Sequence, residues 1–255
     1  MKKILAIARV SILEAFRRKD PYVVLIMVGL IVFGAGLFSR FGTEGVGKFV
    51  KDVAFSVTGM LALLICVVTA ARHLPVEIQN RTLYPLLAKP VSRMYVFLGK
   101  YLGVSVMAST VVLLFSVELF VLFKVLGIPV SGVFWQGVYL RIVLMWIVAA
   151  LTLTMSLMLT HAANVSISLL LSLAMGTFAN SFITVRTELE GLSLRVFDTI
   201  YWLLPHLEFF DLSKREVHGY PLTPAWVMLT LTAYGAIYSA LFMSLGMRRF
   251  KKMNL

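Results

Sequence analysis

The longest uncharged stretch of this chain runs from Ile142 to Val185 and contains no Asp, Glu, Lys or Arg. A transmembrane helix needs about 20 apolar residues, and this stretch is about twice that length. As one continuous helix it would extend roughly 66 Å at about 1.5 Å per residue, which no ordinary bilayer accommodates. The stretch therefore predicts two spans joined by a very tight hairpin, and we place the break at His161–Asn164.

Composition extends this interpretation to the whole chain. Hydrophobic residues make up 60% of the sequence, charged residues only 14%, and the mean hydropathy is +0.90, which does not fit a soluble globular domain. A helix satisfies its own backbone groups without water, so we expect an all-α integral membrane protein with six transmembrane helices. The expected spans are Pro21–Phe38, Val53–Ala71, Tyr95–Phe123, Ile142–Leu159, Ala162–Val185 and Trp226–Met247.

The basic residues predict the orientation of these spans, because Lys and Arg beside a span stay on the cytoplasmic side. With six spans and the N-terminus inside, the cytoplasmic segments hold the whole formal net charge of +12. We therefore expect a multi-pass protein of the cytoplasmic (inner) membrane with both termini in the cytoplasm. Topology and anionic membrane lipid explain the basic clusters, so no nucleic-acid partner is expected.

The first 20 residues are charged throughout and lack the apolar core of a cleavable signal peptide. Their apolar residues recur at helical spacing, which predicts an amphipathic interfacial helix over residues 1–20. That helix either anchors the N-terminus or transmits motion. Residues 21–255 then form one six-span domain, in which 72–94 is a cytoplasmic segment and 186–223 is an outer-face segment.

No catalytic site and no metal site is expected. Cys66 is the only cysteine, the four histidines are scattered, and no catalytic triad or zinc motif has usable spacing. The stretch Gly42–Phe49 resembles a phosphate-binding loop, but Phe49 supplies no hydroxyl for magnesium and the loop falls on the expected outer face. The chain is therefore expected to perform no covalent chemistry itself.

A polar insert between the second and third expected spans is the most distinctive part of the sequence. Its apolar and charged residues allow it to lie along the inner membrane surface with part of it free for a partner. Pro85 and Pro90 prevent it from extending as one long helix. From the residues alone, an ordinary amphipathic loop on lipid and a docking site for a soluble motor both remain open. The pattern is Glu77, then Arg81-Thr82-Leu83, then Leu86-Leu87-Ala88-Lys89-Pro90-Val91-Ser92-Arg93, then Leu98-Gly99-Lys100.

This pattern resembles the permease subunits of ABC transporters of the type-2 exporter class, especially a group linked to multicopper-enzyme maturation. The resemblance is strongest over Met1–Leu102, which includes Lys51-Asp52, and it is diffuse afterwards. It implies a permease half that pairs with a second copy or homologue and with a dimer of cytoplasmic ABC ATPase subunits. ATP and magnesium would bind to the ATPase, with no cofactor on this chain. The copper association rests on very few residues and is not transferred to a substrate.

The resemblance also implies that residues 72–94 form the family's coupling helix, the element that contacts the ATPase. The expected contact residues are Glu77, Arg81, Thr82, Tyr84, Leu86, Lys89, Pro90, Ser92 and Arg93.

Few polar residues lie within the expected spans. Glu118 is the only acid well inside one, and Arg141 starts the next; ionisable residues there are costly and usually paired, so we expect a Glu118–Arg141 bridge as a structural clamp, with a substrate contact as the alternative. Asn164 and Asn180 line a polar path or form interhelical hydrogen bonds.

The outer-face segment 186–223 contains an apolar, aromatic run that suits the membrane interface. We expect a pair of short helices that enter the outer leaflet. They either close the exit of a transport path or form a plain interfacial cap, and an accessory protein on this face is a candidate partner.

The sequence and its resemblance together predict an ABC permease that moves a substrate using ATP hydrolysis on a partner chain, with export as the expected direction. A mechanotransmitter that drives an outer partner or enzyme maturation is the rival on the same scaffold. A secondary transporter is the alternative from another class, although such proteins usually show internal repeats and midplane ionisable residues. Substrate identity, and a homodimer against a heterodimer, are not separable from the sequence.

Overall fold

The computed structural model describes residues 6–10, 26, 29, 34, 46–79, 92–175 and 191–253. Over these residues all regular structure is helical, as expected for the all-α class. The elements are α3 (Val46–Gln79), α5 (Arg93–Val125), α6 (Gly132–Met155), α7 (His161–Met175), α9 (Gly191–Leu203), the 3-10 helix η2 (Leu207–Phe210), α10 (Ser213–Val217) and α11 (Ala225–Lys252).

Four of these helices, α3, α5, α6 and α11, are long and apolar enough to cross a membrane, and α7 is a shorter apolar helix. In chain order, α3, α5, α6, α7 and α11 correspond to the second to the sixth expected spans. The expected continuation of the fifth span, residues 176–185, lies outside the described residues. Of the first expected span only Ile26, Gly29 and Gly34 are described. The total of six spans stays a prediction, and so does the side of the membrane on which each terminus lies.

The uncharged stretch is broken, but a few residues earlier than expected. Helix α6 ends at Met155 and α7 begins at His161, so the turn occupies residues 156–160. Asn164 belongs to the first turn of α7: its backbone N–H donates to the carbonyl of Thr160 at 2.8 Å, and its side-chain Nδ2 donates to the carbonyl of Thr152 in α6 at 3.2 Å. Asn164 therefore fastens the two helices together rather than forming the turn.

Helix α6 begins ten residues before the expected span start at Ile142. Ser131 caps it, because the Ser131 hydroxyl accepts a hydrogen bond from the N–H of Val133 at 3.1 Å. The early start places Arg141 inside the helix instead of at its beginning.

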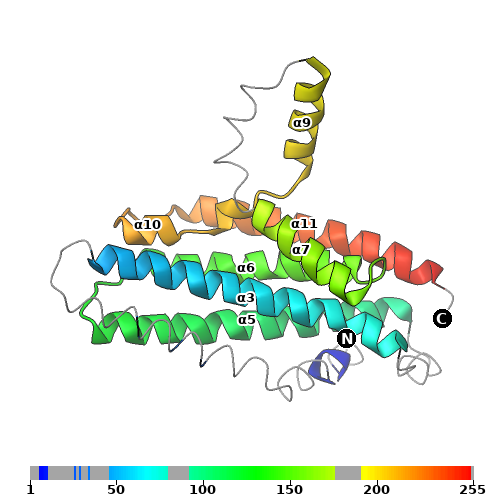
Figure 1. Ribbon diagram of the computed structural model, residues 1–255, viewed down its shortest axis with the longest axis horizontal. Helices are drawn as coiled ribbons and strands as arrows, with labels where there is room; N and C mark the ends of the chain where they lie inside the picture. The colour runs from blue at the N-terminus through cyan, green and yellow to red at the C-terminus, as the bar shows by residue number, and fades with distance from the viewer. Residues whose placement is uncertain are drawn as a thin grey trace.

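Helix α6 is the centre of the bundle and packs against α3, α5, α7 and α11. The helices α3, α5 and α6 run side by side, while α7 lies obliquely across them (Figure 1). Gly235 lets α11 lie close against α6, since a Cβ at Gly235 would lie 2.5 Å from Cγ1 of Val143. Large buried side chains such as Phe123, Leu140 and Met145 fill the space between the helices.

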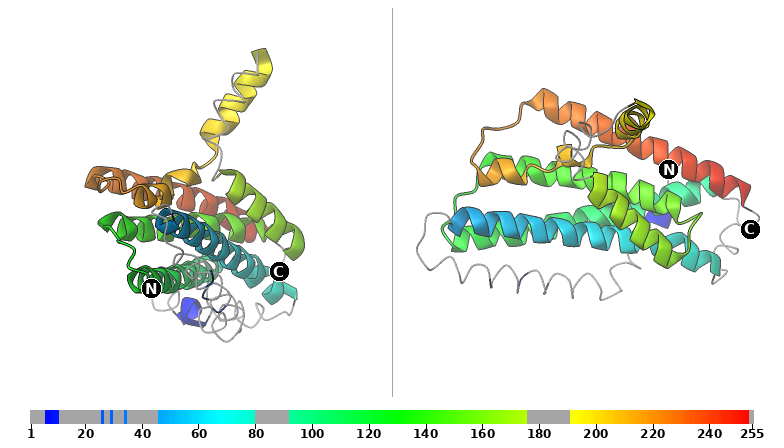
Figure 2. Two further views of the ribbon diagram at one scale, coloured as in Figure 1. Left: turned by 60° about the vertical axis from the view of Figure 1, so that its left-hand side comes forward. Right: turned by 45° about the horizontal axis from the view of Figure 1, so that its top comes forward.

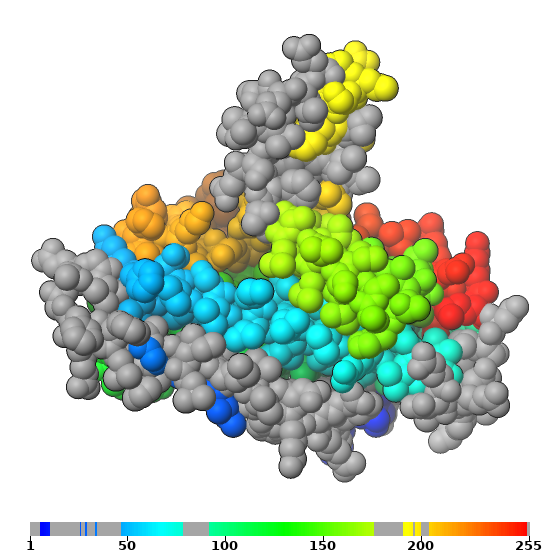
Figure 3. Space-filling model, in the orientation of Figure 1, coloured from blue at the N-terminus to red at the C-terminus, as the bar shows by residue number. Residues whose placement is uncertain are grey.

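The bundle has two ends. The α10 end is the one that holds α10, the start of α3 and the loop before α6 (Figure 1). The C-terminal end is the opposite one, which holds the end of α3, the start of α5 and the end of α11. Helix α9 projects away from the bundle in Figure 1 and in the left view of Figure 2. On the face shown in Figure 3, α7 lies over α3 and α9 stands clear of both.

Candidate functional site

A buried ion pair joins three elements at the α10 end. The Nζ atom of Lys51 in α3 lies 2.9 Å from Oε1 of Glu216 in α10, and the two side chains are only 8% and 1% exposed. Ser131, at the start of α6, donates its backbone N–H to Oε1 of Glu216 at 3.1 Å and its hydroxyl to Oε2. We call Lys51, Ser131 and Glu216 the α10 lock, because they fasten α3, α6 and α10 to one another.

The carboxyl group of Glu216 is held in its charged form. Burial raises its pKa, but the hydrogen bonds from Ser131 and the ammonium of Lys51 outweigh burial and lower the pKa below its ordinary value. A carboxylate that is ionised and surrounded by donors is a firm attachment point at neutral pH.

A second, looser cluster lies beside the lock. Arg141 donates from Nη2 to Oδ1 of Asp211 at 3.4 Å and to the hydroxyl of Ser213 at 3.1 Å, and from Nη1 to the carbonyl of Phe55 at 3.4 Å. Asp211 is half exposed, at 54%, whereas Arg141 is 16% exposed. The guanidinium therefore links α6 to α3 and to the segment before α10.

The expected Glu118–Arg141 bridge is wrong. The carboxylate that lies next to Arg141 is Asp211, and no ion pair joins Arg141 to Glu118 among the described residues. Glu118 instead lies against Gly29, where a Cβ would be 2.7 Å from its Oε1. Sequence spacing predicts that Glu118 and Arg141 lie at the same depth on neighbouring helices. It does not predict that residues 207–217 pack along α6 and bring Asp211 to Arg141.

Gly59 of α3 makes room for the guanidinium of Arg141. A Cβ at Gly59 would lie 3.1 Å from Nη2, 3.2 Å from Cζ and 3.4 Å from Nη1 of Arg141. The two shortest of these distances are tighter than ordinary van der Waals contact, so a side chain at this position would require the guanidinium to shift by a few tenths of an ångström.

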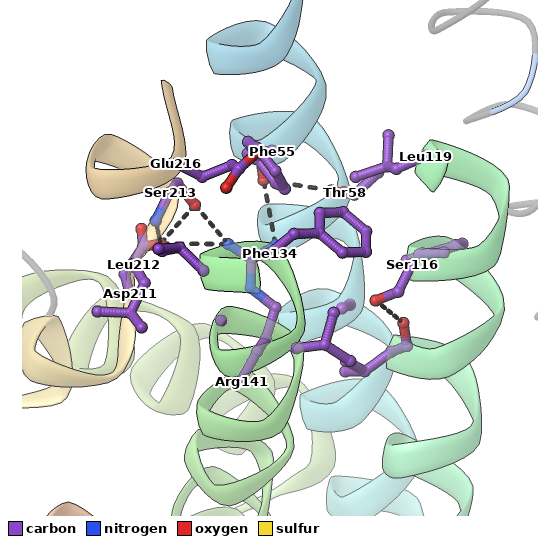
Figure 4. A pocket seen from close by; sticks show the side chains of 16 residues that line it. Phe55, Thr58, Ser116, Leu119, Phe134, Arg141, Asp211, Leu212, Ser213 and Glu216 are labelled. Carbon is purple, nitrogen blue, oxygen red and sulfur yellow. Dashed lines mark hydrogen bonds and ion pairs between the residues drawn. The ribbon is translucent and has the colours of Figure 1, made fainter. Parts of the chain in front are cut away.

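A small cavity of about 30 Å³ lies between α3, α5 and α6 at this level, with room for one or two water molecules. Figure 4 shows Arg141 extending from α6 toward Asp211 and Ser213 at one side of the cavity, with Phe134 and Leu119 on the other. Its interior is apolar and aromatic, and the charged residues Arg141, Asp211 and Glu216 stand along one side. The cavity is lined by Phe55, Thr58, Ala62, Val112, Phe115, Ser116, Leu119, Val133, Phe134, Gly137, Val138, Arg141, Asp211, Leu212, Ser213 and Glu216.

The chain that follows α10 is also fastened to α6. The side chain of Gln136 donates from Nε2 to the carbonyl of Thr223 and accepts, at Oε1, from the N–H of Thr223, both at 2.9 Å. Residues 207–223 are thus attached to the bundle by the α10 lock, by Arg141 and by Gln136.

At the C-terminal end the two borders of the 72–94 segment are each fastened to a helix. Glu77 in the last turn of α3 forms an ion pair with Lys100 of α5, whose side chain is buried. Arg93, the first residue of α5, donates from Nη1 to the carbonyls of Phe250, Lys251 and Met253 at 3.2, 3.3 and 2.6 Å. Arg93 therefore caps the end of α11.

The remaining expected coupling residues are not placed by the structure. Arg81, Thr82, Tyr84, Leu86, Lys89 and Pro90 lie outside the described residues. Ser92 is exposed, and its carbonyl accepts a hydrogen bond from the N–H of Tyr95 at 2.9 Å as α5 begins. Contact of the 72–94 segment with an ATPase stays a prediction.

Asn164 of α7 forms a hydrogen bond to α6 and is itself held by a hydrogen bond within α7. Besides its bond to Thr152, Asn164 accepts a hydrogen bond at Oδ1 from the hydroxyl of Ser168 at 3.0 Å. Both side chains are fully buried. This favours the hydrogen-bonding interpretation of Asn164 over the polar path, while Asn180 lies outside the described residues.

No sequence pattern predicts the α10 lock, because its residues are far apart along the chain. Lys51 enters the sequence pattern only within Lys51-Asp52, and Ser131, Asp211 and Glu216 belong to no motif. The one available signal is that Lys51 and Glu216 are charged residues beside predominantly apolar segments, where a buried charge needs a partner. In the described part of the chain, no group of three or more His, Cys, Asp or Glu residues is arranged to hold a metal ion.

Comparison with known proteins gave one family. The model of the family described as "ABC-2 family transporter protein" matches residues 16–182, which is well over half of the chain. A comparison with curated proteins found no match.

Proposed function

The chain belongs to the ABC-2 family of transporter proteins, and from this membership we propose that it is a permease subunit driven by a separate cytoplasmic ABC ATPase. The family match carries the proposal. The ATPase binds ATP and magnesium and contacts the 72–94 segment, while a second permease copy or homologue completes the path in the cytoplasmic membrane.

The shape of α3 supports mechanical coupling between the two ends of the bundle. Lys51 and Glu77 lie in one continuous helix, 26 residues apart, which is roughly 39 Å of helix. A continuous helix moves largely as one body, so a displacement at Glu77 reaches Lys51 at the opposite end. Pro75 lies in the last two turns, within the expected coupling segment, and the helix before it is free of proline over residues 46–74, so that longer part is the one that moves as one body.

The contacts at the borders of the 72–94 segment support the same proposal. Glu77 ties the end of α3 to α5 through Lys100, and Arg93 ties the start of α5 to the end of α11. A force on the segment therefore acts on three long helices together.

At the α10 end, residues 207–223 are in position to close the exit of the path. They are held by the α10 lock, Arg141 and Gln136, and the cavity beneath them accommodates only one or two water molecules. In this proposal the present conformation is closed at the outer end, and the ATP cycle separates residues 207–223 from α3 and α6. Export is the expected direction.

A mechanotransmitter is the second candidate. The projecting helix α9 favours it, because α9 stands clear of the bundle and presents exposed residues such as Leu192 and Arg195 (Figure 2). In that case the same motion would act on an outer partner or on enzyme maturation, with no cargo crossing the membrane.

Co-purification with ABC ATPase subunits from the same cells tests the proposal. We expect wild type to retain an ATPase in mild detergent, and Arg81→Glu or Lys89→Glu in the coupling segment to lose it. Arg195→Glu, an equal charge change on exposed α9, is the matched control and should retain the ATPase.

Glu77→Ala is a poor test of docking, because it removes the partner of buried Lys100 and so disturbs folding. If wild type retains no ATPase under any mild condition, or if the Arg195→Glu control loses it as readily as Arg81→Glu, the coupling assignment is overturned.

A further inference from the structure

The position of Arg141 calls for more than a structural role. Arg141 lies roughly 14 Å along α6 from its first residue, within a helix long and apolar enough to span the membrane. A cation at such a depth is costly unless a nearby anion or polar group compensates for it.

The compensation that Arg141 receives is weak. Its three contacts are 3.1 to 3.4 Å long, whereas charge-assisted hydrogen bonds are usually about 2.7 to 2.9 Å. Asp211, the nearest carboxylate, already accepts at Oδ1 from the N–H and the hydroxyl of Ser213 and is half exposed to its surroundings. Asp211 thus has partners of its own and is easily displaced from Arg141, in contrast to Glu216, which is wholly buried against Lys51.

The guanidinium of Arg141 lies against Gly59 and borders a cavity with aromatic lining residues. Gly59 leaves the surface of α3 free of a side chain at this point, and Arg141 lines the cavity together with the rings of Phe55, Phe115 and Phe134. A planar guanidinium binds carboxylate or phosphate groups with two parallel hydrogen bonds. A charged group and an aromatic, apolar wall therefore adjoin one another (Figure 4).

From this arrangement we propose that Arg141 binds the anionic head of a small amphiphile, with the apolar part of the ligand against Phe55, Phe115 and Phe134. The ligand carries one phosphate or carboxylate group, and on binding it displaces Asp211 from Arg141 and moves residues 207–217 away from α6, so a small probe enters the site without ATP. The inference rests on the proposed function in so far as it names the class of cargo. A bilayer lipid with the same head chemistry is the other source of such a ligand.

The test is a binding measurement on the full chain in phosphatidylcholine nanodiscs, with hexyl phosphate as the probe and empty nanodiscs as the blank. We expect calorimetry to detect hexyl phosphate binding, with neither hexanol nor hexyltrimethylammonium competing for the site. Arg141→Gln should weaken binding about tenfold or more, because a hydrogen bond to a charged group is lost.

Two further variants separate an anion site from a plain clamp. Asp211→Asn removes the competing carboxylate and should leave binding unchanged or tighter, although it breaks the same ion pair as Arg141→Gln. Gly59→Ala keeps every charge but displaces the guanidinium, so it should weaken binding; it also keeps the test valid if Arg141→Gln does not fold. Absence of hexyl phosphate binding to wild type, or equal loss in Asp211→Asn and Arg141→Gln, overturns the inference.

The source of the ligand is decided in proteoliposomes with the co-purified ATPase. ATP-driven movement of hexyl phosphate identifies a cargo, and phosphatidylglycerol that co-purifies with wild type but not with Arg141→Gln identifies a bilayer lipid; either result supports the anion site. If an ATPase couples but hexyl phosphate does not bind, the inference fails alone. If hexyl phosphate binds at Arg141 but no ATPase is retained, the proposed function fails alone.

Discussion

Glu216 accepts hydrogen bonds from Lys51 and from two groups of Ser131 while its side chain is almost wholly buried. Removing one partner of a buried ion pair leaves the other charge without compensation. We therefore expect Glu216→Gln to lower the free energy of unfolding by about 3 kcal/mol. Thermal unfolding in detergent, followed by tryptophan fluorescence, measures this change.

The matched control for this variant is the double replacement Lys51→Met with Glu216→Leu, which removes both charges. It should be more stable than Glu216→Gln, since no unpaired charge remains in the lock. Equal stability of Glu216→Gln and wild type would show that the lock contributes little.

The same residue gives the α10 end a defined pH dependence. The pKa of Glu216 is lower in the folded protein than its ordinary value of 4.5, so its contribution to stability is fully present above about pH 4.5. That contribution is lost as the pH falls through the lower folded pKa. Wild type should therefore lose stability more steeply than Glu216→Gln below pH 4.5, and parallel curves for the two proteins would contradict this assignment.

Gly246 gives a further test at the scale of single residues. A Cβ at Gly246 of α11 would lie 2.6 Å from Cζ of Phe97 and 2.7 Å from the hydroxyl of Thr154. Gly246→Ala should destabilise the protein by about 1 to 3 kcal/mol through overpacking. Gly47→Ala is the control, because a Cβ there meets no atom within 4 Å and alanine favours a helix. Similar destabilisation by both variants would contradict the close approach of α11.

At the scale of whole elements, the attachment of α11 depends on Arg93. The three carbonyls at the end of α11 accept hydrogen bonds from one guanidinium nitrogen, which satisfies groups that have no partner within the helix. Arg93→Ala should release the last turn of α11 and speed tryptic cleavage at the exposed Arg248 and Arg249 several-fold. Met94→Ala, a change at an exposed neighbour on the same turn of α5, should leave the cleavage rate unaltered.

Hydropathy located the long helices because burial in lipid and burial in a helical core demand the same residues. The predicted break at His161–Asn164 lies directly after the observed turn at residues 156–160. Helix α6 starts earlier than hydropathy predicts because Arg141 interrupts the apolar run, and Asp211 and Ser213 compensate part of that charge. Such a partner lies 70 residues away along the chain, and its position depends on the course of residues 207–217, which no local pattern specifies.

At the scale of the whole molecule, the arrangement of the helices predicts which segments share a side of the membrane. Lys252 lies at the C-terminal end of the bundle and Lys214 at the α10 end (Figure 1). Lys214→Cys should react with a membrane-impermeant maleimide in intact cells, and Lys252→Cys should react only after the membrane is opened. Wild type is the blank, because Cys66 is fully buried. Equal labelling of both variants in intact cells would contradict the expected orientation.

The central claim is that ATP hydrolysis on the partner opens the α10 end of the bundle. Thr58 lines the cavity and is 2% exposed, so Thr58→Cys should react slowly with a hydrophilic thiol reagent at rest. In the complex with its ATPase, we predict that this labelling accelerates several-fold during ATP hydrolysis, while labelling of Leu222→Cys, at a position already exposed, stays constant. An unchanged labelling rate for Thr58→Cys with ATP, with ADP and without the partner would contradict the account.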